Sequence, residues 1–501
     1  MKGKIKVLSL LLALAMVASM FVACKDKPAP SSEGSSSAPA KREDVNLIWY
    51  HWGDKPKQPD AVIAELNKMS KEAIQTTVDF RFATGDDQKL KTIMSTGGEF
   101  DIAFTCAWFA NYVVAAQNNQ LADLTEKLPK VAPKLWEYIP ENCWAGARVN
   151  GKIYAVPTYK DSAAAQYWTV HKEYVIDGAK ADAELKAAGK KLSTVTPLLE
   201  KVKKYHDESK KAYPHDLTAP MNYNWAGLNG LGNGWDDFGL SNIRMGINLT
   251  AGNTKVISQY DDPDYVADLK TIKSWYDNGL VNKGASEVEK EFEFQVVGTG
   301  QGWDGCEAIW GSGKDYTIQM VKKYGPIYTT GSIQGSMNGI SPNSKKIDRA
   351  LQYIEYMNTN KDYRNTLGYG IKGTNWKLND QGQVENLTKD AWQPGMFAQA
   401  SFFELYPLKP APANMYTNLK AVNDSAEASP LVGYVPVVKD LQTEIAACQA
   451  VIDKQYKYLQ TGNIKDVDAT VNKLKADLKA AGMDKIIAEI QKQVDEFLKA
   501  K

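Results

Sequence analysis

The chain has 501 residues, of which 44% are hydrophobic and 24% charged, with 60 Lys and Arg against 59 Asp and Glu. A chain of this length exceeds the ~250–300 residues that a single hydrophobic core usually serves, so we expect two lobes or domains. The balanced charge argues against nucleic-acid binding, which needs a concentrated basic face.

The first 24 residues have the pattern of a secretory signal: a basic start over 1–6, an apolar run over 7–23, and then Cys24. A basic start, a short apolar core and small residues before the cleavage point are typical of such signals. Because a thiol at the cleavage point can carry lipid, we predict a lipoprotein signal peptide over 1–23 and a palmitate-type membrane anchor on Cys24. Phe21 stands where such signals usually carry Leu. The alternative is an amino-terminal membrane helix, for which the apolar run is at the short limit.

Residues 24–44 are predicted to form a tether. After Cys24 this segment holds only Pro, Ser, Ala, Gly and charged residues, with no aromatic or branched aliphatic side chain. Such a composition cannot bury enough apolar surface to offset the entropy of ordering, so we expect it to be flexible. As a random coil it would span ~25 Å. It would hold a folded body just off a membrane surface.

The folded body begins with alternating strands and helices. The patterns predict strands at 45–50, 77–82 and 101–105, and helices at 59–74 and 88–94. Strand, helix, strand, helix and strand at these spacings indicate a parallel α/β sheet. Loops that follow the carboxyl ends of such strands form a cleft.

Further along, the pattern changes between strands, long loops and helices. A short predicted strand lies within 151–157, and a helix-rich stretch follows 166–170. Glycine-rich loops that contain tryptophan lie at 222–242 and 298–311. Loops this long are usually functional or disordered. Predicted helices follow the amphipathic spacing at 264–278, 347–357, 441–459, 467–478 and 483–498.

Cysteine spacing and aromatic content carry further information. Apart from Cys24, the cysteines are Cys106, Cys143, Cys306 and Cys448. No two of them have C-x-x-C spacing, which argues against structural zinc, and we expect buried free thiols and no metal site. Many of the 13 Trp lie in loops rich in Gly, Asn or Asp, which suits a ligand surface.

Several motifs of catalytic and cofactor sites are misplaced, incomplete or absent. Residues 300–305 spell G-x-G-x-x-G, but they lie deep in the chain and carry Trp303 where a backbone would have to approach phosphate. Residues 311–315 lack the upstream Gly and the Ser or Thr of a phosphate loop. There is no H-E-x-x-H and no G-x-S-x-G. We therefore predict no cofactor and no catalytic residue, although abundant carboxylates leave a glycosidase pair open.

Three short motifs occur in a characteristic order: N-Q-L-A-D-L-T at 119–125, G-K-I-Y-A-V-P at 151–157, and G-S-M-N-G-I-S-P-N-S at 335–344. This set resembles the extracellular solute-binding proteins (family 1) of ABC transporters. The segments 367–376 and 474–498 are similar to the LipO-like branch with a DUF3502 region. Within that branch, Lys372 and Asn375-Trp376 depart from the usual Glu and His-Tyr.

The resemblance implies an α/β fold of the periplasmic-binding-protein-like type II, with two α/β lobes, hinge strands and extra carboxyl-terminal helices. On this mapping lobe 1 comprises 45–156 and 331–400. Lobe 2 comprises 159–327 and 401–501, including the carboxyl-terminal helices. The chain would cross between the lobes at 157–158 and again at 328–331.

Candidate ligand-binding residues follow from their positions at strand ends and in the long loops. From lobe 1 we expect Trp52, Asp54 and Trp108. The crossing and lobe 2 are expected to contribute Tyr159, Asp161, Trp225, Trp235, Asp236, Trp303 and Asp304. Aromatic faces suit the C–H faces of a sugar ring, while carboxylates accept its hydroxyls. Trp144, Trp168 and Trp275 lie in or beside periodic apolar runs and are expected in the core.

The expected function is capture of a carbohydrate, an oligosaccharide in particular, and its delivery to the transmembrane subunits of an ABC permease. We expect a monomer, held by Cys24 on the outer face of the bacterial cell membrane, and not an enzyme. A peptide or another solute as ligand, and a secreted glycoside hydrolase, remain alternatives.

Overall fold

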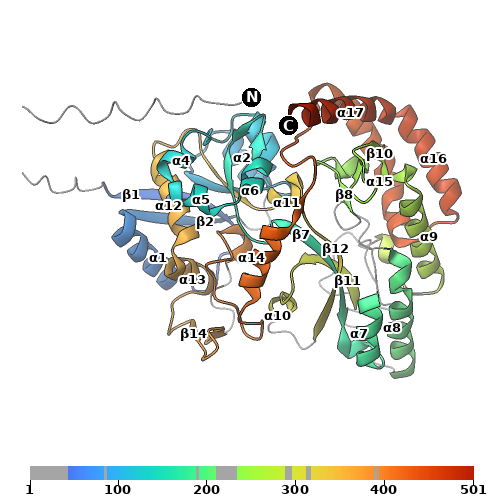
Figure 1. Ribbon diagram of the computed structural model, residues 1–501, viewed down its shortest axis with the longest axis horizontal. Helices are drawn as coiled ribbons and strands as arrows, with labels where there is room; N and C mark the ends of the chain where they lie inside the picture. Colours follow the sequence, from blue (N-terminus) through green and yellow to red (C-terminus); the bar gives the residue numbers. More distant parts are fainter. Residues whose placement is uncertain are drawn as a thin grey trace, which may run out of the picture. The chain divides into compact units, whose positions relative to one another are not determined.

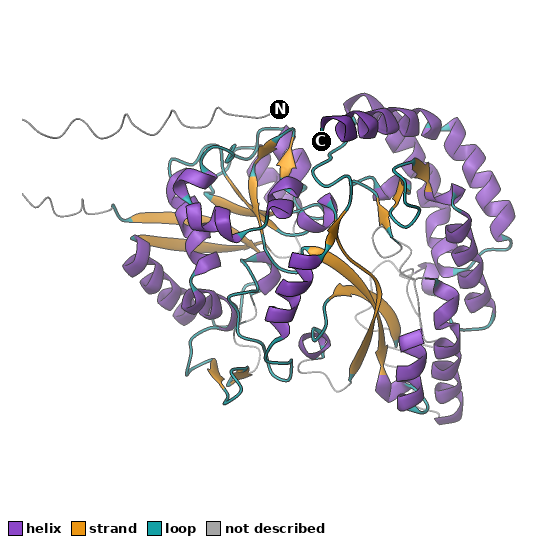
Figure 2. Ribbon diagram, in the orientation of Figure 1, coloured by secondary structure: helices purple, strands orange, loops and turns teal. Residues whose placement is uncertain are grey.

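The computed structural model describes residues 43–83, 87–187, 191–209, 234–287, 296–311, 317–388, 392 and 394–501 (Figures 1 and 2). The signal peptide, Cys24, most of the tether and Trp225 lie outside the described residues. Residues 43–501 form one compact unit. In the described part, no helix combines the length and apolar character needed to cross a membrane.

A five-stranded sheet organises the first lobe, with the strand order β2-β1-β3-β13-β6. Its strands are β1 (Val45–Trp52), β2 (Thr76–Ala83), β3 (Ile102–Thr105), β6 (Ala155–Pro157) and β13 (Met337–Ile340). β1 pairs in parallel with β2 and β3, while β13 runs antiparallel to β3 and β6. The predicted parallel arrangement of the first three strands is confirmed, but the whole sheet is mixed, because the late strand β13 is inserted antiparallel between β3 and β6.

The helix α1 (Pro59–Ile74) shows why this local pattern folds as predicted. Val62, Leu66 and Ser70 recur every four residues and are buried, so one face packs on the sheet. Pro59 occupies the first turn, where its missing N–H costs nothing. Gln75 ends the helix in the left-handed conformation, with its N–H donating to the Lys71 carbonyl.

Helices and a small hairpin cover this sheet. They are α2 (Asp87–Ser95), α3 (Tyr112–Gln117), α4 (Leu128–Val131), α5 (Pro133–Tyr138), α6 (Glu141–Gly146), α11 (Thr330–Ile333), α12 (Ile347–Thr359) and α13 (Lys361–Tyr369), with the hairpin β4 (Arg148–Val149) and β5 (Lys152–Ile153). Trp49, Phe104, Trp144 and Tyr353 are among the buried residues of the first core. Trp144 lies in this core as predicted.

A four-stranded sheet organises the second lobe, with the order β11-β7-β12-β16. Its strands are β7 (Ala163–His171), β11 (Val297–Gly302), β12 (Ile318–Tyr328) and β16 (Glu427–Ala428). A three-stranded sheet lies in the same lobe, made of β8 (Trp235–Asp236), β9 (Met245–Asn248) and β10 (Val256–Ser258). Trp168 and Trp275 are buried in the second core, as predicted.

Helices surround the second core (Figure 1). They are α7 (Gly178–Ala187), α8 (Thr196–Ser209), α9 (Pro263–Asp277), α15 (Gln442–Thr461), α16 (Val467–Ala480) and α17 (Met483–Ala500). The short helix α10 (Glu307–Trp310) follows β11 and does not belong to this core. Short 3-10 turns connect them at η1 (Lys172–Tyr174), η2 (Leu192–Val195), η5 (Ser241–Ile243), η6 (Gln259–Asp261), η7 (Ala285–Glu287) and η9 (Lys439–Leu441). The three predicted carboxyl-terminal helices are therefore present, and their buried residues belong to the second core.

A third, smaller apolar cluster joins residues far apart in the sequence. It contains Tyr369, Trp376, Phe402, Leu405 and Met415 among others. Its elements are the hairpin β14 (Trp376–Leu378) and β15 (Val384–Asn386), η8 (Met396–Ala398) and α14 (Met415–Ser425). The predicted lobe boundary at 400–401 runs through this cluster, and the boundaries stay a prediction.

The chain connects the two sheets three times. β6 continues through 158–162 into β7, and β12 continues into α11. The third connection is 427–434, in which β16 pairs with the end of β12. Its residue Leu431 is buried in the second core, and the next residue, Val432, is buried in the first core. The first two connections were predicted from the sequence, whereas the third was not.

Candidate functional site

An aromatic cluster lies where β1 and β3 end. Because the two strands are parallel neighbours, their carboxyl ends share one edge of the sheet. β1 ends at Trp52, and Trp108 follows β3 by three residues. Their ring centroids are 5.7 Å apart, and Phe397 lies 4.8 Å from Trp52 and 6.2 Å from Trp108. We call Trp52, Phe104, Trp108 and Phe397 the aromatic cluster.

Trp108 presents its ring to solvent in a fixed orientation. Its side chain is 55% exposed, which is unusual for a residue of this size. The indole Nε1–H donates to the Gly335 carbonyl at 2.9 Å, and the preceding Ala107 N–H donates to the Gln334 carbonyl at 2.9 Å. The polar edge is therefore satisfied, and the flat apolar face is free to stack on a ligand ring. Asp54, two residues beyond Trp52, is exposed.

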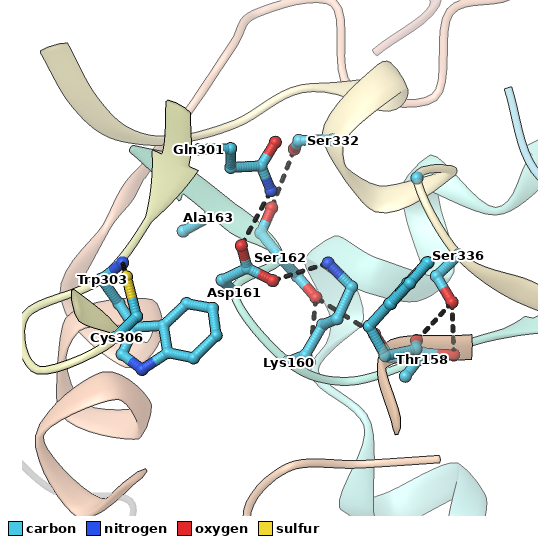
Figure 3. A network of polar contacts seen from close by, with 12 residues as sticks. Thr158, Lys160, Asp161, Ser162, Ala163, Gln301, Trp303, Cys306, Ser332 and Ser336 are labelled. Carbon is cyan, nitrogen blue, oxygen red and sulfur yellow. Dashed lines mark hydrogen bonds and ion pairs between the residues drawn. The ribbon is translucent and has the colours of Figure 1, made fainter. Parts of the chain in front are cut away.

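The first connection between the lobes carries a buried ion pair (Figure 3). Lys160 Nζ lies 2.6 Å from Asp161 Oδ1, and the two residues are 8% and 4% exposed. Gln301, at the end of β11, donates from Nε2 to the other Asp161 oxygen at 2.9 Å. Since a buried carboxylate needs such partners, this network fixes Asp161 beside the end of β11.

Hydroxyl groups tie the same connection to lobe 1 (Figure 3). Ser336 Oγ lies 3.0 Å from Thr158 Oγ1 and donates to the Phe397 carbonyl at 2.7 Å. Ser332 Oγ donates to the Ser162 carbonyl at 2.8 Å. Ser336 therefore links the segment that carries Phe397 to Thr158 in the first connection.

Tyr159 is fully buried. Its hydroxyl donates to Asp424 Oδ1 at 3.1 Å, and its ring lies 4.5 Å from that of Phe403. Burial is the main cause that raises the pKa of the Tyr159 phenol. In this conformation the side chain packs inside the connection and offers no surface to a ligand.

Trp303 and Asp304 follow β11 on the lobe 2 side. The half-buried Trp303 ring lies 5.5 Å from Phe402, and among the described residues its indole Nε1 has no hydrogen-bond partner although it is buried. Asp304 is exposed and accepts the Tyr167 hydroxyl at 2.9 Å. This part of the site offers a ring and a carboxylate side by side.

The glycines before Trp303 have a packing role. A Cβ added at Gly302 would lie 2.6 Å from Cys306 Sγ and 3.0 Å from the Trp310 ring. A Cβ at Gly300 would meet the same ring at 3.2 Å. The G-x-G spacing at 300–302 therefore lets Trp310 lie against β11, and no dinucleotide is needed to explain it.

Trp235 and Asp236 lie in β8 and are buried, at 2% and 4% exposed. Asp236 Oδ2 accepts the Ser429 hydroxyl at 2.7 Å, which attaches β8 to the third connection. Desolvation raises the pKa of the Asp236 carboxyl to about 6. The structure thus places these two residues under the third connection, apart from the contacts of the aromatic cluster.

The cysteines do not form a reactive group. Cys106, Cys143, Cys306 and Cys448 are buried free thiols, as predicted. Burial raises the pKa of Cys143 to about 12 and that of Cys448 to about 11, so the reactive thiolate is scarce at neutral pH. Over the described residues, no group of three or more His, Cys, Asp or Glu is arranged to hold a metal ion.

Comparison with known proteins adds independent findings. Residues 430–499 match the family described as "Domain of unknown function (DUF3502)". A carbohydrate ABC transporter substrate-binding protein of Streptococcus pneumoniae serotype 4 is 27% identical over 498 residues, covering 93% of this chain and 94% of the relative. The crystal structure of the N-glycan transport solute binding protein from Streptococcus pneumoniae matches with a TM-score of 0.80 and 25% identity, over 91% of this chain and 99% of that one.

The chain is thus similar over nearly its whole length to a solute-binding protein of ABC transporters, and its carboxyl-terminal part matches the DUF3502 family. The predicted type II fold is confirmed. The DUF3502 match covers the third connection from Pro430 onward and helices α15, α16 and α17. Solute-binding proteins of ABC importers are extracytoplasmic, and the relatives found are transport proteins and not enzymes.

Four residues of the candidate site were not predicted from the sequence. Phe397 and Phe402 lie in a stretch without hydrophobic periodicity, so nothing marked them as facing Trp52 and Trp303. Lys160 and Gln301 lie beside predicted residues, and only the fold brings them to Asp161. The one available signal was the pair Phe402-Phe403 close to a predicted lobe boundary.

Proposed function

We propose that this solute-binding protein captures an oligosaccharide between its two lobes and delivers it unreacted to the transmembrane subunits of an ABC permease. The observation that carries the proposal is the exposed, fixed ring of Trp108 in the aromatic cluster. A flat apolar surface of this kind suits the C–H face of a pyranose ring.

Polar groups near the aromatic residues supply what the sugar hydroxyls need. Asp54 and Asp304 are exposed carboxylates in segments that follow strands β1 and β11. Gln301 holds Asp161 through one amide hydrogen and lies next in sequence to Gly302 and Trp303. A pocket with apolar walls and a few fixed polar groups is the usual form of a small-molecule site.

Closure of the lobes would bring the two sets of groups onto one ligand. The aromatic cluster belongs to lobe 1, and Trp303 and Asp304 follow a strand of lobe 2. Closure about the three connections would trap the ligand through contacts that form only when the lobes meet.

The relatives suggest which sugars to test first. The Streptococcus pneumoniae structure has been determined in complex with Man1GlcNAc and with Man5GlcNAc, and this chain matches those complexes with TM-scores of 0.75 and 0.70 at 25% and 26% identity. We therefore propose oligosaccharides of mannose and N-acetylglucosamine as the first candidate ligands.

We also propose that residues 1–23 are removed as a signal peptide and that Cys24 carries the lipid anchor, with the protein acting as a monomer. The basic start, apolar run and cysteine support the signal peptide and the anchor. Metabolic labelling with palmitate tests it: the wild type should carry label and sediment with membranes, whereas Cys24→Ser should do neither. Label retained by Cys24→Ser would contradict the anchor.

Isothermal titration of the purified protein with mannose–N-acetylglucosamine oligosaccharides tests the ligand class, with peptides of similar mass as the comparison. In addition, oligosaccharide at 100 times its dissociation constant should raise the free energy of unfolding of the protein by about 2.7 kcal/mol. Recovery of intact sugar is expected, because we propose that the protein performs no catalysis. Binding of peptides alone would overturn the sugar assignment, and cleavage products would overturn the binding-protein role.

A further inference from the structure

Arg364, in α13, is a fully buried cation whose hydrogen bonds all go to neutral groups. Its side chain is 0% exposed, and burial lowers the pKa of the guanidinium to about 10. Nε donates to the Ser401 carbonyl at 2.7 Å, and Nη1 donates to Gln399 Oε1 at 2.8 Å. Nη2 donates to the carbonyls of Met396 at 3.1 Å and Ala400 at 3.3 Å. Within the described part of the chain, Arg364 makes no ion pair.

Burying a charge without a counter-ion is unfavourable, and here four hydrogen-bond acceptors offset part of that cost. The rigid fork of a guanidinium fixes several acceptors in one geometry, which a lysine ammonium does not do. All four acceptors belong to 396–401, a segment with only a single 3-10 turn of its own. Arg364 therefore supplies the hydrogen bonds that regular structure would otherwise provide.

This segment and the next residue carry aromatic rings to both sides of the proposed cleft. Phe397 lies 4.8 Å from Trp52 in the aromatic cluster, and its carbonyl accepts the Ser336 hydroxyl. Phe402 lies 5.5 Å from Trp303 on the lobe 2 side, and its N–H donates to the Tyr159 carbonyl at 3.1 Å. Only four residues, 398–401, separate the two aromatic contacts along the chain.

We propose that Arg364 is a positioning residue for ligand binding: it holds 396–402 so that Phe397 and Phe402 support Trp52 and Trp303. Arg364 touches no ligand itself and acts through the segment. This inference rests on the proposed function, because it assigns the ligand to the surface that these rings form.

The test compares Arg364→Lys with Arg349→Lys. Arg349 also donates to several main-chain carbonyls in lobe 1, those of Glu43, Ile74 and Gln75, but at the start of the sheet and away from the aromatic cluster. Arg364→Lys should weaken oligosaccharide binding about tenfold, since hydrogen bonds from a charged donor are among the stronger ones. Arg349→Lys should lower the melting temperature and leave the dissociation constant unchanged.

Near-ultraviolet circular dichroism supplies a readout that needs no ligand. Because coupled tryptophan rings give this signal, Arg364→Lys should change it and Arg349→Lys should not. In the background of Phe397→Ala, Arg364→Lys should cost less affinity than in the wild type, because part of its effect passes through that ring. If Arg364→Lys does not fold, Gln399→Leu removes one acceptor and should weaken binding about threefold.

The possible outcomes distinguish failure of the proposed function from failure of the positioning role of Arg364. A wild type that binds no oligosaccharide contradicts the proposed function. A folded Arg364→Lys variant with wild-type affinity and a wild-type near-ultraviolet spectrum contradicts the positioning role. Equal loss of affinity in Arg364→Lys and Arg349→Lys also overturns it, because the effect would then be one of general stability.

Discussion

The indole of Trp108 meets that of Trp52 edge to face, with ring centroids 5.7 Å apart and ring planes at 86°. This geometry is one that aromatic pairs favour. The Trp108 side chain stays 55% exposed in this pair, while that of Trp52 is half-buried. Trp108 is therefore the residue of the aromatic cluster best placed to carry a ligand ring.

We expect Trp108→Ala to raise the dissociation constant for the oligosaccharide about tenfold or more, as for aromatic residues that dominate other binding surfaces. Stability should change little, because the side chain is 55% exposed. Titration calorimetry and thermal melting measure the two effects. Val114→Ala, at a side chain 50% exposed on α3, serves as the control. A Trp108→Ala variant that binds within twofold of the wild type would argue against the stacking role.

His51 makes stability depend on pH. It lies between Trp49 and Phe82, and neither ring nitrogen has a partner among the described residues. Burial lowers its pKa from 6.5 to about 3. The unfolded chain therefore takes up a proton as the pH falls below 6.5 while the folded protein does not, so stability is lost from that pH downward to about 3.

His51→Phe should remove this contribution. The protonation of His51 should lower the free energy of unfolding of the wild type by about 3 kcal/mol at pH 4.5 relative to pH 8. In the variant this part of the decrease should be absent. Urea unfolding at the two pH values measures the difference. A Phe variant with the same loss of stability as the wild type would show that His51 is not the group responsible.

Asp236 gives the opposite pH dependence. Its carboxyl has a raised pKa of about 6 against an ordinary value of 3.8. The folded protein therefore holds this proton more tightly than the unfolded chain, and stability falls as the pH rises from 3.8 to 6. The side chain of Asp236→Asn does not titrate, so this loss should be absent from the variant. The difference in free energy of unfolding, variant minus wild type, should therefore increase by about 2 kcal/mol from pH 4 to pH 8. Denaturant unfolding of both proteins at each pH provides the measurement; a pH-independent difference would exclude this titration.

Gly302→Ala tests the packing role of the glycine run. The new Cβ would lie 2.6 Å from Cys306 Sγ and 3.0 Å from Trp310, so the variant should lose about 1–3 kcal/mol of stability. Gly284→Ala is the matched control, because its Cβ would have no atom within 4 Å. Equal stability of the two variants would mean that β11 and Trp310 can move to accommodate the new Cβ without loss of stability.

Local sequence patterns predicted the first half of lobe 1 well. The predicted helix 59–74 coincides with α1, and the predicted strands at 45–50, 77–82 and 101–105 fall on β1, β2 and β3 to within two residues at each end. These elements depend on hydrophobic period and on helix-terminal residues, both of which are local. The predicted core residues Trp144, Trp168 and Trp275 are likewise 0–1% exposed.

Long-range pairing could not be predicted in the same way. β13 lies between β3 and β6 in the first sheet, although it is more than 200 residues beyond β3 in the sequence. β12 carries polar residues such as Gln319 and Lys322, which hide its strand pattern. At the site, sequence alone could not distinguish the exposed Trp108 from the buried Trp235, because neither lies in a periodic segment. The position of Phe397 depends on Arg364 and Ser336, which are distant in sequence.

A crystal structure of the protein with a saturating mannose–N-acetylglucosamine oligosaccharide tests the central claim most directly. We predict an intact sugar between the lobes, with one pyranose ring stacked on the face of Trp108 and another group in contact with Trp303. A saturated complex in which the sugar lies elsewhere, with Trp108 still open to solvent, would contradict the account.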